Sequence, residues 1–399
     1  MNGLSRTAIG PLLVLMTASL NAWGPSAHAQ TTLNPDISLI GDVRASGHND
    51  GAAEDADQLN LDLEEAELAV QGYLNPYVRA DVFLAWHGTG ESEIEELYAT
   101  FLRGLPLGLS VRAGQYLLDF GKVNPLHPHA YSFINRPLAH EEFFGEEGLR
   151  DVGVSASIPI PTGNVATTLS ADMLRGDFLQ PHEHGDEHAE EAMRVRSLQE
   201  EHEEDERPNE RAFAARLNSF VALDEYTSLS LGVTGLTGIP HEDQRRWVGG
   251  ADVKLRWKPD RYRSFTVVGE WLVNRQPAEE HHDEEEIDTL SALRAQQSSS
   301  LQEEEVSGDI TSHGLFGYFD YQFRQRFNVG AQGSWAQALE NNDATGWELG
   351  MFAGFAPAEE TTLLRALISY GEPIGSDEAI WAGTLQLIFS LGPHKPHIF

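Results

Sequence analysis

Histidine and acidic side chains gather at three places in this sequence, in combinations that can bind a divalent metal. The first place holds three histidines and an adjacent acid, and its members are His127, His129, His140 and Glu141. Three imidazole nitrogens and one carboxylate oxygen form a donor set that suits tetrahedral zinc. The spacing is not diagnostic of zinc, and hydrogen bonding of these histidines to neighbouring polar groups is the alternative interpretation.

The other two places are the tracts PHEHGDEHAEE at 181–191 and EEHHDEEE at 279–286. Neutral imidazole binds zinc, copper or nickel, and nearby carboxylates both coordinate and concentrate cations. The candidate ligands in and beside the tracts are His182, His184, His188, His202, His281 and His282. The alternative is that these acidic segments are merely solvated. We therefore expect no required cofactor, with zinc or another divalent cation as a candidate ligand.

The overall composition excludes several classes of protein. The 399 residues include 62 acids against 27 lysines and arginines, for a formal net charge of −35. A nucleic-acid partner is not expected, because phosphate binding needs a basic face. The absence of cysteine excludes a disulfide framework. No motif supplies a catalytic nucleophile, so an enzyme is not expected.

The first 29 residues have the pattern of a secretory signal peptide. Arg6 precedes the apolar run AIGPLLVLMTASL, and Ala27-His28-Ala29 forms a small-x-small cleavage site. The apolar run is shorter than the roughly 20 residues that a spanning helix needs. We expect removal of 1–29 and export of residues 30–399.

Beyond that segment, apolar residues alternate with small or polar ones, as at 78–86 and 327–335. This period of two is the pattern of β-strands. No window after residue 30 resembles a transmembrane helix, so strands would have to span any membrane that holds the chain. Near Glu64-Glu65 the apolar residues change parity, which predicts a β-bulge there.

The connections between these segments are sorted by length. Short turns such as 75–76 alternate with long links such as 119–148, 176–208, 237–245 and 276–310. This sorting is typical of an up-and-down outer-membrane barrel, whereas a soluble sandwich has no reason for it. The sequence predicts an all-β fold: one transmembrane antiparallel β-barrel of about 16 strands with long extracellular loops.

The third long link, 119–148, differs from the others because it is aromatic. Its rings are Phe120, Tyr131, Phe133, Phe143 and Phe144. Burying them requires a cavity, and the lumen of a barrel of about 16 strands is the only large one. We expect this link to fold inward as a constriction loop, while 176–208 and 276–310 form His- and acid-rich extracellular loops.

Charged residues on the polar faces of the strands are candidates for lining the pore. They are Arg44, Arg79, Asp81, Arg112, Arg216, Lys254, Arg256, Glu270, Asp320 and Arg365. Both signs occur in similar numbers, so they predict no ion selectivity. Ion pairs that brace the wall are the alternative interpretation.

Several stretches resemble a group of Gram-negative outer-membrane proteins. They are HPHAYSFINRPLAHEEFFG at 127–145, LNPDISLIGDVRA at 33–45, EAELAVQGYLNPYVRADVFLA at 65–85 and the terminal LGPHKPHIF. The group is similar to phosphate-selective porins and is also described as a zinc-regulated, TonB-dependent-like outer membrane receptor family. The resemblance implies a 16-stranded porin-like barrel and a link to zinc supply. A TonB-dependent transporter needs a plug domain and about 22 strands, which this length does not accommodate.

Together these features predict a porin-like channel in the outer membrane of a Gram-negative bacterium. It would pass small solutes and be associated with divalent metal (zinc) uptake through its His- and acid-rich outer loops. Outer-membrane lipid and lipopolysaccharide are the expected surroundings, and the chain could form a homotrimer. The alternative is a non-transporting metal-binding or adhesive protein that uses its barrel only as an anchor.

Overall fold

A computed structural model describes residues 35–392 except 54, 89–90, 177–210, 242–243, 278–307 and 359–360. The predicted signal peptide and both His- and acid-rich tracts lie outside the described residues. Among the described residues no helix is both long enough and apolar enough to cross a membrane.

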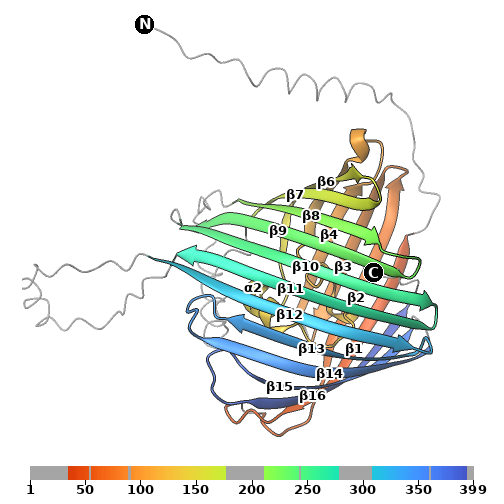
Figure 1. Cartoon of the computed structure of the whole chain (residues 1–399). Helices are drawn as coiled ribbons and strands as arrows, with labels where there is room; N and C mark the ends of the chain where they lie inside the picture. Colours follow the sequence, from red (N-terminus) through yellow and green to blue (C-terminus); the bar gives the residue numbers. More distant parts are fainter. Residues whose placement is uncertain are drawn as a thin grey trace, which may run out of the picture.

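The described residues form sixteen strands that follow one another around a single sheet (Figure 1). The strands are β1 (Asp36–His48), β2 (Asn60–Asn75), β3 (Val78–His87), β4 (Glu91–Phe101), β5 (Ser110–Leu117), β6 (Arg150–Thr162), β7 (Val165–Leu174), β8 (Ala212–Ala222), β9 (Thr227–His241), β10 (Gln244–Asp260), β11 (Arg263–Pro277), β12 (Asp309–Phe323), β13 (Phe327–Gln337), β14 (Thr345–Ala358), β15 (Thr362–Glu372) and β16 (Ile380–Leu391). Each pairs antiparallel with its neighbours in the chain.

The sheet closes on itself because β1 also pairs with β16. The register runs from Leu39 opposite Leu391 to His48 opposite Ala382. Closure pairs the backbone of both end strands and leaves no sheet edge. The expectation of an antiparallel up-and-down barrel with about 16 strands is confirmed.

The change of parity in the second strand is a β-bulge, as the sequence predicts. Asp42 of β1 lies opposite Glu65, whereas Val43 lies opposite Leu63, so Glu64 is the extra residue. Beyond it Glu65 and Glu67 turn to the interior and are buried.

One predicted long link is wrong. The segment 237–245 is mostly strand, because β9 and β10 continue their pairing as far as His241 opposite Gln244. Only residues 242–243 connect the two strands. The segment holds one glycine and one proline, Gly238 and Pro240, residues that are uncommon inside a strand, and β9 nevertheless extends past both.

Large apolar side chains cover the outside of the barrel. Met351 is 73% exposed, Ile368 61% and Leu385 63%. The residues that alternate with them, such as Gln332 and Arg365, face inward and are buried. An apolar exterior with a polar interior is the arrangement of a barrel surrounded by lipid.

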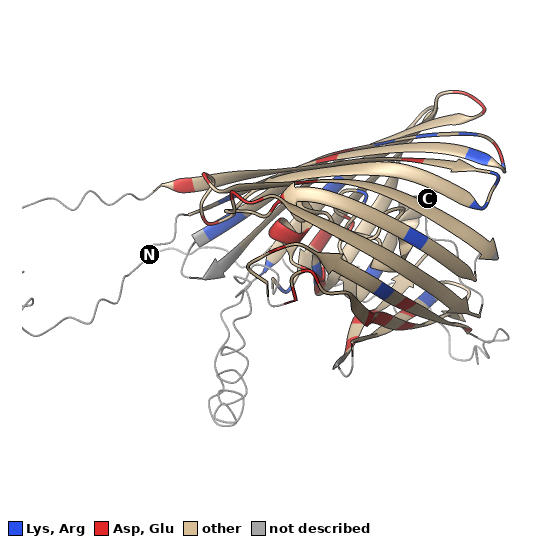
Figure 2. Cartoon of the chain, turned by 90° about the horizontal axis from the view of Figure 1, so that it is seen from below, with Lys and Arg blue, Asp and Glu red and all other residues tan. Residues whose placement is uncertain are grey.

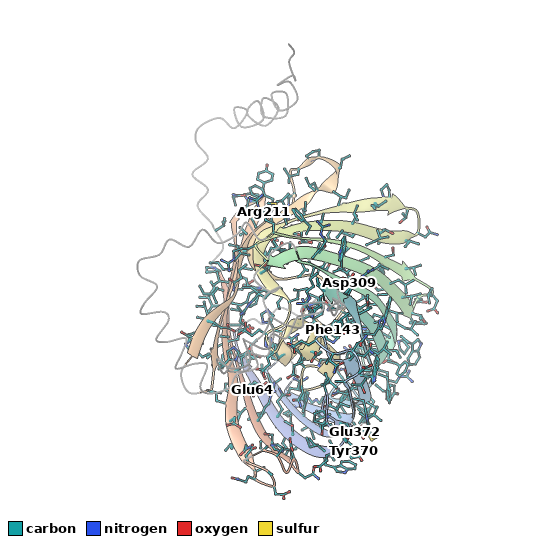
Figure 3. The ribbon with its side chains drawn as sticks, turned by 90° about the vertical axis from the view of Figure 1, so that its left-hand side faces the viewer. Glu64, Phe143, Arg211, Asp309, Tyr370 and Glu372 are labelled. Atoms are coloured by element: carbon teal, nitrogen blue, oxygen red, sulfur yellow. The ribbon has the colours of Figure 1, made fainter. Side chains whose placement is uncertain are left out.

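The hydrophobic core lies inside the ring of strands and is built on the long connection between β5 and β6. In one cluster Phe120 and Phe143 of this connection pack with Val248 of β10. In a second cluster Phe133 packs with Phe316 of β12. Figure 3 shows Phe143 inside the barrel, within the surrounding strands.

The described residues also include three short helices. They are η1 (Pro106–Gly108), η2 (Pro128–Ala130) and α2 (Leu138–Phe144). The last two belong to the β5–β6 connection. Helix α2 begins after Pro137, whose fixed φ suits a helix start, and ends at Gly145 with φ 74°. It lies against the inner faces of β11 to β14.

Candidate functional site

The connection of residues 118–149, called the lumenal loop below, fills part of the barrel interior. All five of its aromatic rings are buried, with Phe120 1% exposed and Phe144 4% exposed. Burying one such ring contributes on the order of 1.5–3 kcal/mol. The expectation that this loop folds inward to bury its rings is confirmed.

Glu270 of β11 is the most heavily used polar anchor of the lumenal loop. Its Oε1 accepts hydrogen bonds from the backbone N–H of Lys122 at 2.6 Å and of Val123 at 2.9 Å. Its Oε2 lies 2.9 Å from Nε2 of His140. One buried carboxylate therefore joins the start of the loop to helix α2.

Gly121 allows this arrangement. Its φ is +68°, a left-handed conformation that favours glycine. A Cβ at this position would overlap the carboxylate of Glu270. Any larger residue would therefore compete with the anchor for the same space.

Two arginines hold other parts of the loop through its backbone. Arg365 of β15 donates to the carbonyl oxygens of Tyr131 and of Phe133, the latter at 2.6 Å. Arg216 of β8 donates to the carbonyl oxygen of Gly121 at 2.9 Å and to Asp252 at 2.7 Å. The loop is thus fastened to well-separated parts of the wall.

Several of the other predicted pore-lining residues pair with polar neighbours along the wall. Arg44 binds Asp42 at 2.9 Å, Arg79 pairs with Asp81, and Asp320 accepts from Asn328 at 2.9 Å. Arg112 lies over the ring of Tyr116, with its Cζ 3.8 Å from the ring centroid, and Lys254 and Arg256 are partly buried. Acidic and basic residues are interspersed over the barrel (Figure 2). These contacts fit the wall-bracing interpretation, and lining of a water-filled pore stays a prediction.

The imidazole of His127 lies among three buried glutamates. Its Nδ1 is 3.0 Å from Oε2 of Glu67 and 3.2 Å from Oε2 of Glu95, while its Nε2 is 2.8 Å from Oε1 of Glu96. Burial alone would lower the pKa of His127, but the charge of Glu67 and the close carboxylates outweigh it and hold that pKa well above its ordinary value.

His129 forms an adjoining group with Glu65 and Glu67. Its Nδ1 lies 3.5 Å from Oε1 of Glu65 and 3.8 Å from Oε2 of Glu67. Burial, only partly offset by the charge of Glu67, lowers the pKa of His129. The rings of His127 and His129 are stacked with their centroids 5.7 Å apart. Oε2 of Glu67 thus lies near the Nδ1 atoms of both His127 and His129.

These six residues are called the lumenal cluster: Glu65, Glu67, Glu95, Glu96, His127 and His129. Two β-bulges produce it. Glu64 is the extra residue on β2, and on β4 Glu96 lies opposite Phe83 while Ile94 lies opposite Leu84, which leaves Glu95 as the extra residue. Bulges re-aim side chains, and here they let carboxylates of both strands reach the histidines.

The predicted grouping of four ligands needs correction. His127 and His129 do come together, but His140 binds Glu270 instead. Glu141 is largely exposed on helix α2 and is in none of the candidate metal-binding groups of the described residues. The six tract histidines, His182, His184, His188, His202, His281 and His282, lie outside the described residues.

Sequence reasoning missed the four glutamates of the lumenal cluster. The signal for them was the acid-rich stretch ESEIEELY at 91–98, which is unusual in a strand with an apolar face. The change of parity at Glu64-Glu65 was a second signal. Neither reveals which histidine the acids meet, because that pairing is made between the loop and the wall.

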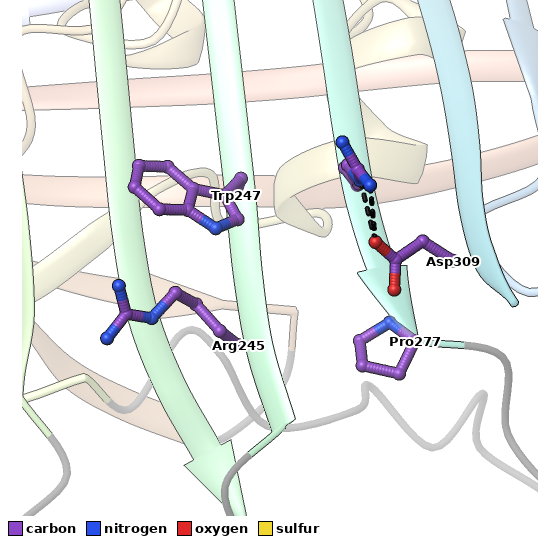
Figure 4. A pocket seen from close by; sticks show the side chains of 5 residues that line it. Arg245, Trp247, Pro277 and Asp309 are labelled. Carbon is purple, nitrogen blue, oxygen red and sulfur yellow. Dashed lines mark hydrogen bonds and ion pairs between the residues drawn. The ribbon is translucent and has the colours of Figure 1, made fainter. Parts of the chain in front are cut away.

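A pocket lies where β10 begins, β11 ends and β12 begins (Figure 4). It is lined by Arg245, Trp247, Arg275, Pro277 and Asp309. Arg275 binds Oδ2 of Asp309 through Nε at 2.8 Å and Nη2 at 2.7 Å. With two guanidinium groups against one carboxylate, the pocket has an excess of positive charge. Phosphate-bearing lipid headgroups fit such a surface; lipopolysaccharide as a partner stays a prediction.

No protein-family model matches this chain. An uncharacterized protein of Aquifex aeolicus is 26% identical over 346 residues, which cover 78% of this chain and 66% of that protein. This chain thus spans just under two thirds of that relative's length. Membership of the phosphate-selective or zinc-regulated group stays a prediction.

Solved structures with the same architecture are outer-membrane porins. The anion-selective porin from Comamonas acidovorans superposes with a TM-score of 0.53 at 10% identity, covering 90% of this chain and all of that one. The outer membrane channel DcaP of Acinetobacter baumannii superposes with a TM-score of 0.53 at 11% identity, covering 92% of this chain and all of that one. OmpT of Vibrio cholerae, in a trimer form, superposes with a TM-score of 0.53 at 9% identity, covering 90% of this chain and all of that one. At such identities the likeness concerns the fold alone, so a homotrimer of this chain stays a prediction.

Proposed function

We propose that this chain is a porin-like diffusion channel of the outer membrane, in which the lumenal loop limits passage to small solutes. The observation that carries the proposal is the position of that loop inside a closed barrel. A barrel of about 16 strands leaves an aqueous interior that wall side chains alone do not fill. A loop anchored at Glu270, Arg216 and Arg365 would narrow this interior.

Localisation in the outer membrane is supported by the exterior of the barrel. Side chains such as Met351, Ile368 and Leu385 would expose a large apolar surface to water. The same surface is stable in a bilayer, where the closed sheet pairs every described strand with both of its neighbours. The porin fold of the structural neighbours agrees with this placement.

Association with divalent metal is the finer part of the proposal. The His- and acid-rich tracts would raise the local concentration of cations above the entrance. Zinc is a suitable ion because imidazole and carboxylate groups occur together. The tracts would change only the local concentration of cations, while the lumenal loop would determine which solutes pass.

The proposal predicts small, discrete conductance steps when purified protein is added to a planar lipid bilayer. A narrow water-filled path should give steps well below those of a barrel without an inward loop. If correctly folded protein inserts into the bilayer and gives no steps, the channel is excluded. The barrel would then serve as an anchor for metal-binding or adhesive loops.

A further inference from the structure

We infer that the lumenal cluster binds one divalent cation of the zinc class, which fastens the lumenal loop to β2 and β4. The inference begins with His127, Glu67 and Glu95. The three donor atoms are Nδ1 of His127 and the Oε2 atoms of Glu67 and Glu95, and all of them lie within 4.8 Å of one another.

The separations of these atoms fit a shared ion. Nδ1 of His127 is 3.0 Å from Oε2 of Glu67 and 3.2 Å from Oε2 of Glu95. Around tetrahedral zinc with bonds of about 2.0–2.1 Å, neighbouring ligand atoms lie about 3.3 Å apart. A small outward movement of each side chain is enough to admit the ion.

These atoms also lack the partners that buried polar atoms normally have. Oε2 of Glu67, Oε2 of Glu95 and Nδ1 of His127 are buried and make no hydrogen bond of acceptable geometry with described residues. Glu67 is 1% exposed and His127 4% exposed. Buried ligand-type atoms that lie close together without hydrogen-bond geometry are typical of a metal site without its metal.

The second ring nitrogen of His127 supports the same conclusion. Nε2 lies 2.8 Å from Oε1 of Glu96. Metal-binding histidines usually donate their other N–H to a carboxylate, which fixes the ring and makes it a better ligand. Glu96 is therefore a positioning residue, and it also accepts the backbone N–H of Leu117 at 2.9 Å.

The charge of the cluster requires a counter-ion. Four carboxylates are buried together, and among the described residues no lysine or arginine forms an ion pair with any of them. A divalent cation held by oxygen and nitrogen ligands compensates two of these negative charges. Glu65 and His129 lie beside Glu67 and can complete the coordination.

The position of the ion defines its role. Glu67 belongs to β2, Glu95 to β4 and His127 to the lumenal loop, so one ion joins three segments that are distant in the sequence. It would thereby hold the narrowest part of the interior in place. Binding itself does not depend on the proposed channel function, whereas this role of the ion does.

The test is the metal content of purified full-length protein in detergent. The protein is stripped with chelator and dialysed against zinc buffered at a low free concentration, so that weak sites in the tracts stay empty. We expect about one zinc ion per wild-type chain. In His127→Gln/Glu95→Gln the affinity should fall at least tenfold and the ion should be lost.

His140→Gln is the matched control, because His140 is also a buried histidine of this loop but contacts Glu270. This variant should keep its zinc. A wild-type chain without a bound ion, or a double variant that retains it, would overturn the inference.

X-ray absorption of the wild type loaded with one equivalent of zinc gives an answer that needs no variant. Imidazole and oxygen ligands support the site, and a spectrum without imidazole scattering refutes it. If the protein conducts ions but binds no zinc at the lumenal cluster, the site is refuted and the channel function is not. If it binds one zinc but gives no conductance, the channel function is refuted and the site is not.

Discussion

Single-channel conductance should rise severalfold when residues 124–143 are removed and Val123 is joined to Phe144 by a short glycine linker. The deletion takes out three of the five buried aromatic rings of the lumenal loop, which are Tyr131, Phe133 and Phe143. It leaves every strand and every ladder of the barrel in place. The cross-section available to ions then becomes that of the barrel wall. Planar-bilayer recordings measure the change directly.

The control for this deletion is a shortening of another connection at the same end of the barrel. Residues 340–343 lie between β13 and β14 and are exposed. Removing them changes the length of a connection without touching the lumen, and the conductance should stay the same. If the first deletion left the conductance of a correctly folded barrel unchanged, the lumenal loop would not be the constriction.

Replacing Glu270 with alanine should detach much of the lumenal loop while the barrel stays folded. The change leaves the backbone N–H groups of Lys122 and Val123 without their acceptor and removes the buried partner of His140. Breaking a buried charged contact by removing one partner costs about 3–5 kcal/mol. Because each 1.4 kcal/mol is a factor of ten, hydrogen exchange of the loop should accelerate by about a hundredfold or more.

Hydrogen-exchange mass spectrometry can follow peptides of 118–149 and of the strands separately. Glu270→Gln is the matched variant, since its carbonyl oxygen can still accept from the two N–H groups, and it should show a smaller acceleration. Asp320→Ala is a second control, because Asp320 also faces the interior but binds Asn328 of the wall. Equal exchange in wild type and Glu270→Ala would show that the loop is held by its aromatic core alone.

The architecture of the barrel was predictable because its cause is local. Period-two alternation, as at 78–86, follows from the geometry of a strand between lipid and water. The bulge at Glu64 was predictable for the same reason, since a change of parity shows directly in the sequence. The inward folding of the loop followed from its rings, because Phe133 and Phe143 need a cavity whatever its shape.

The candidate site was predictable only in part, because its contacts join distant segments. His127 and His129 were predicted as ligands, but the carboxylates beside them, Glu67 and Glu95, lie on strands that no spacing rule connects to the loop. His140 was assigned to the same site and instead binds Glu270, some 130 residues away in the sequence. The extent of β9 and β10 was missed, because these strands remain paired as far as His241 opposite Gln244.

The position of the lumenal loop inside the barrel is the central claim, and a designed disulfide tests it most directly. A Cβ built on Gly314 of β12 would lie 3.2 Å from Cβ of Ala139 on helix α2. Disulfides have Cβ separations of about 3.5–4.5 Å, so a shift of a few tenths of an ångström suffices. The chain contains no cysteine, so no other thiol competes. We predict that Ala139→Cys/Gly314→Cys forms this disulfide in intact outer membranes, while Glu141→Cys/Gly314→Cys does not. Two free thiols in Ala139→Cys/Gly314→Cys, both labelled by a maleimide that cannot cross the membrane, would contradict the account.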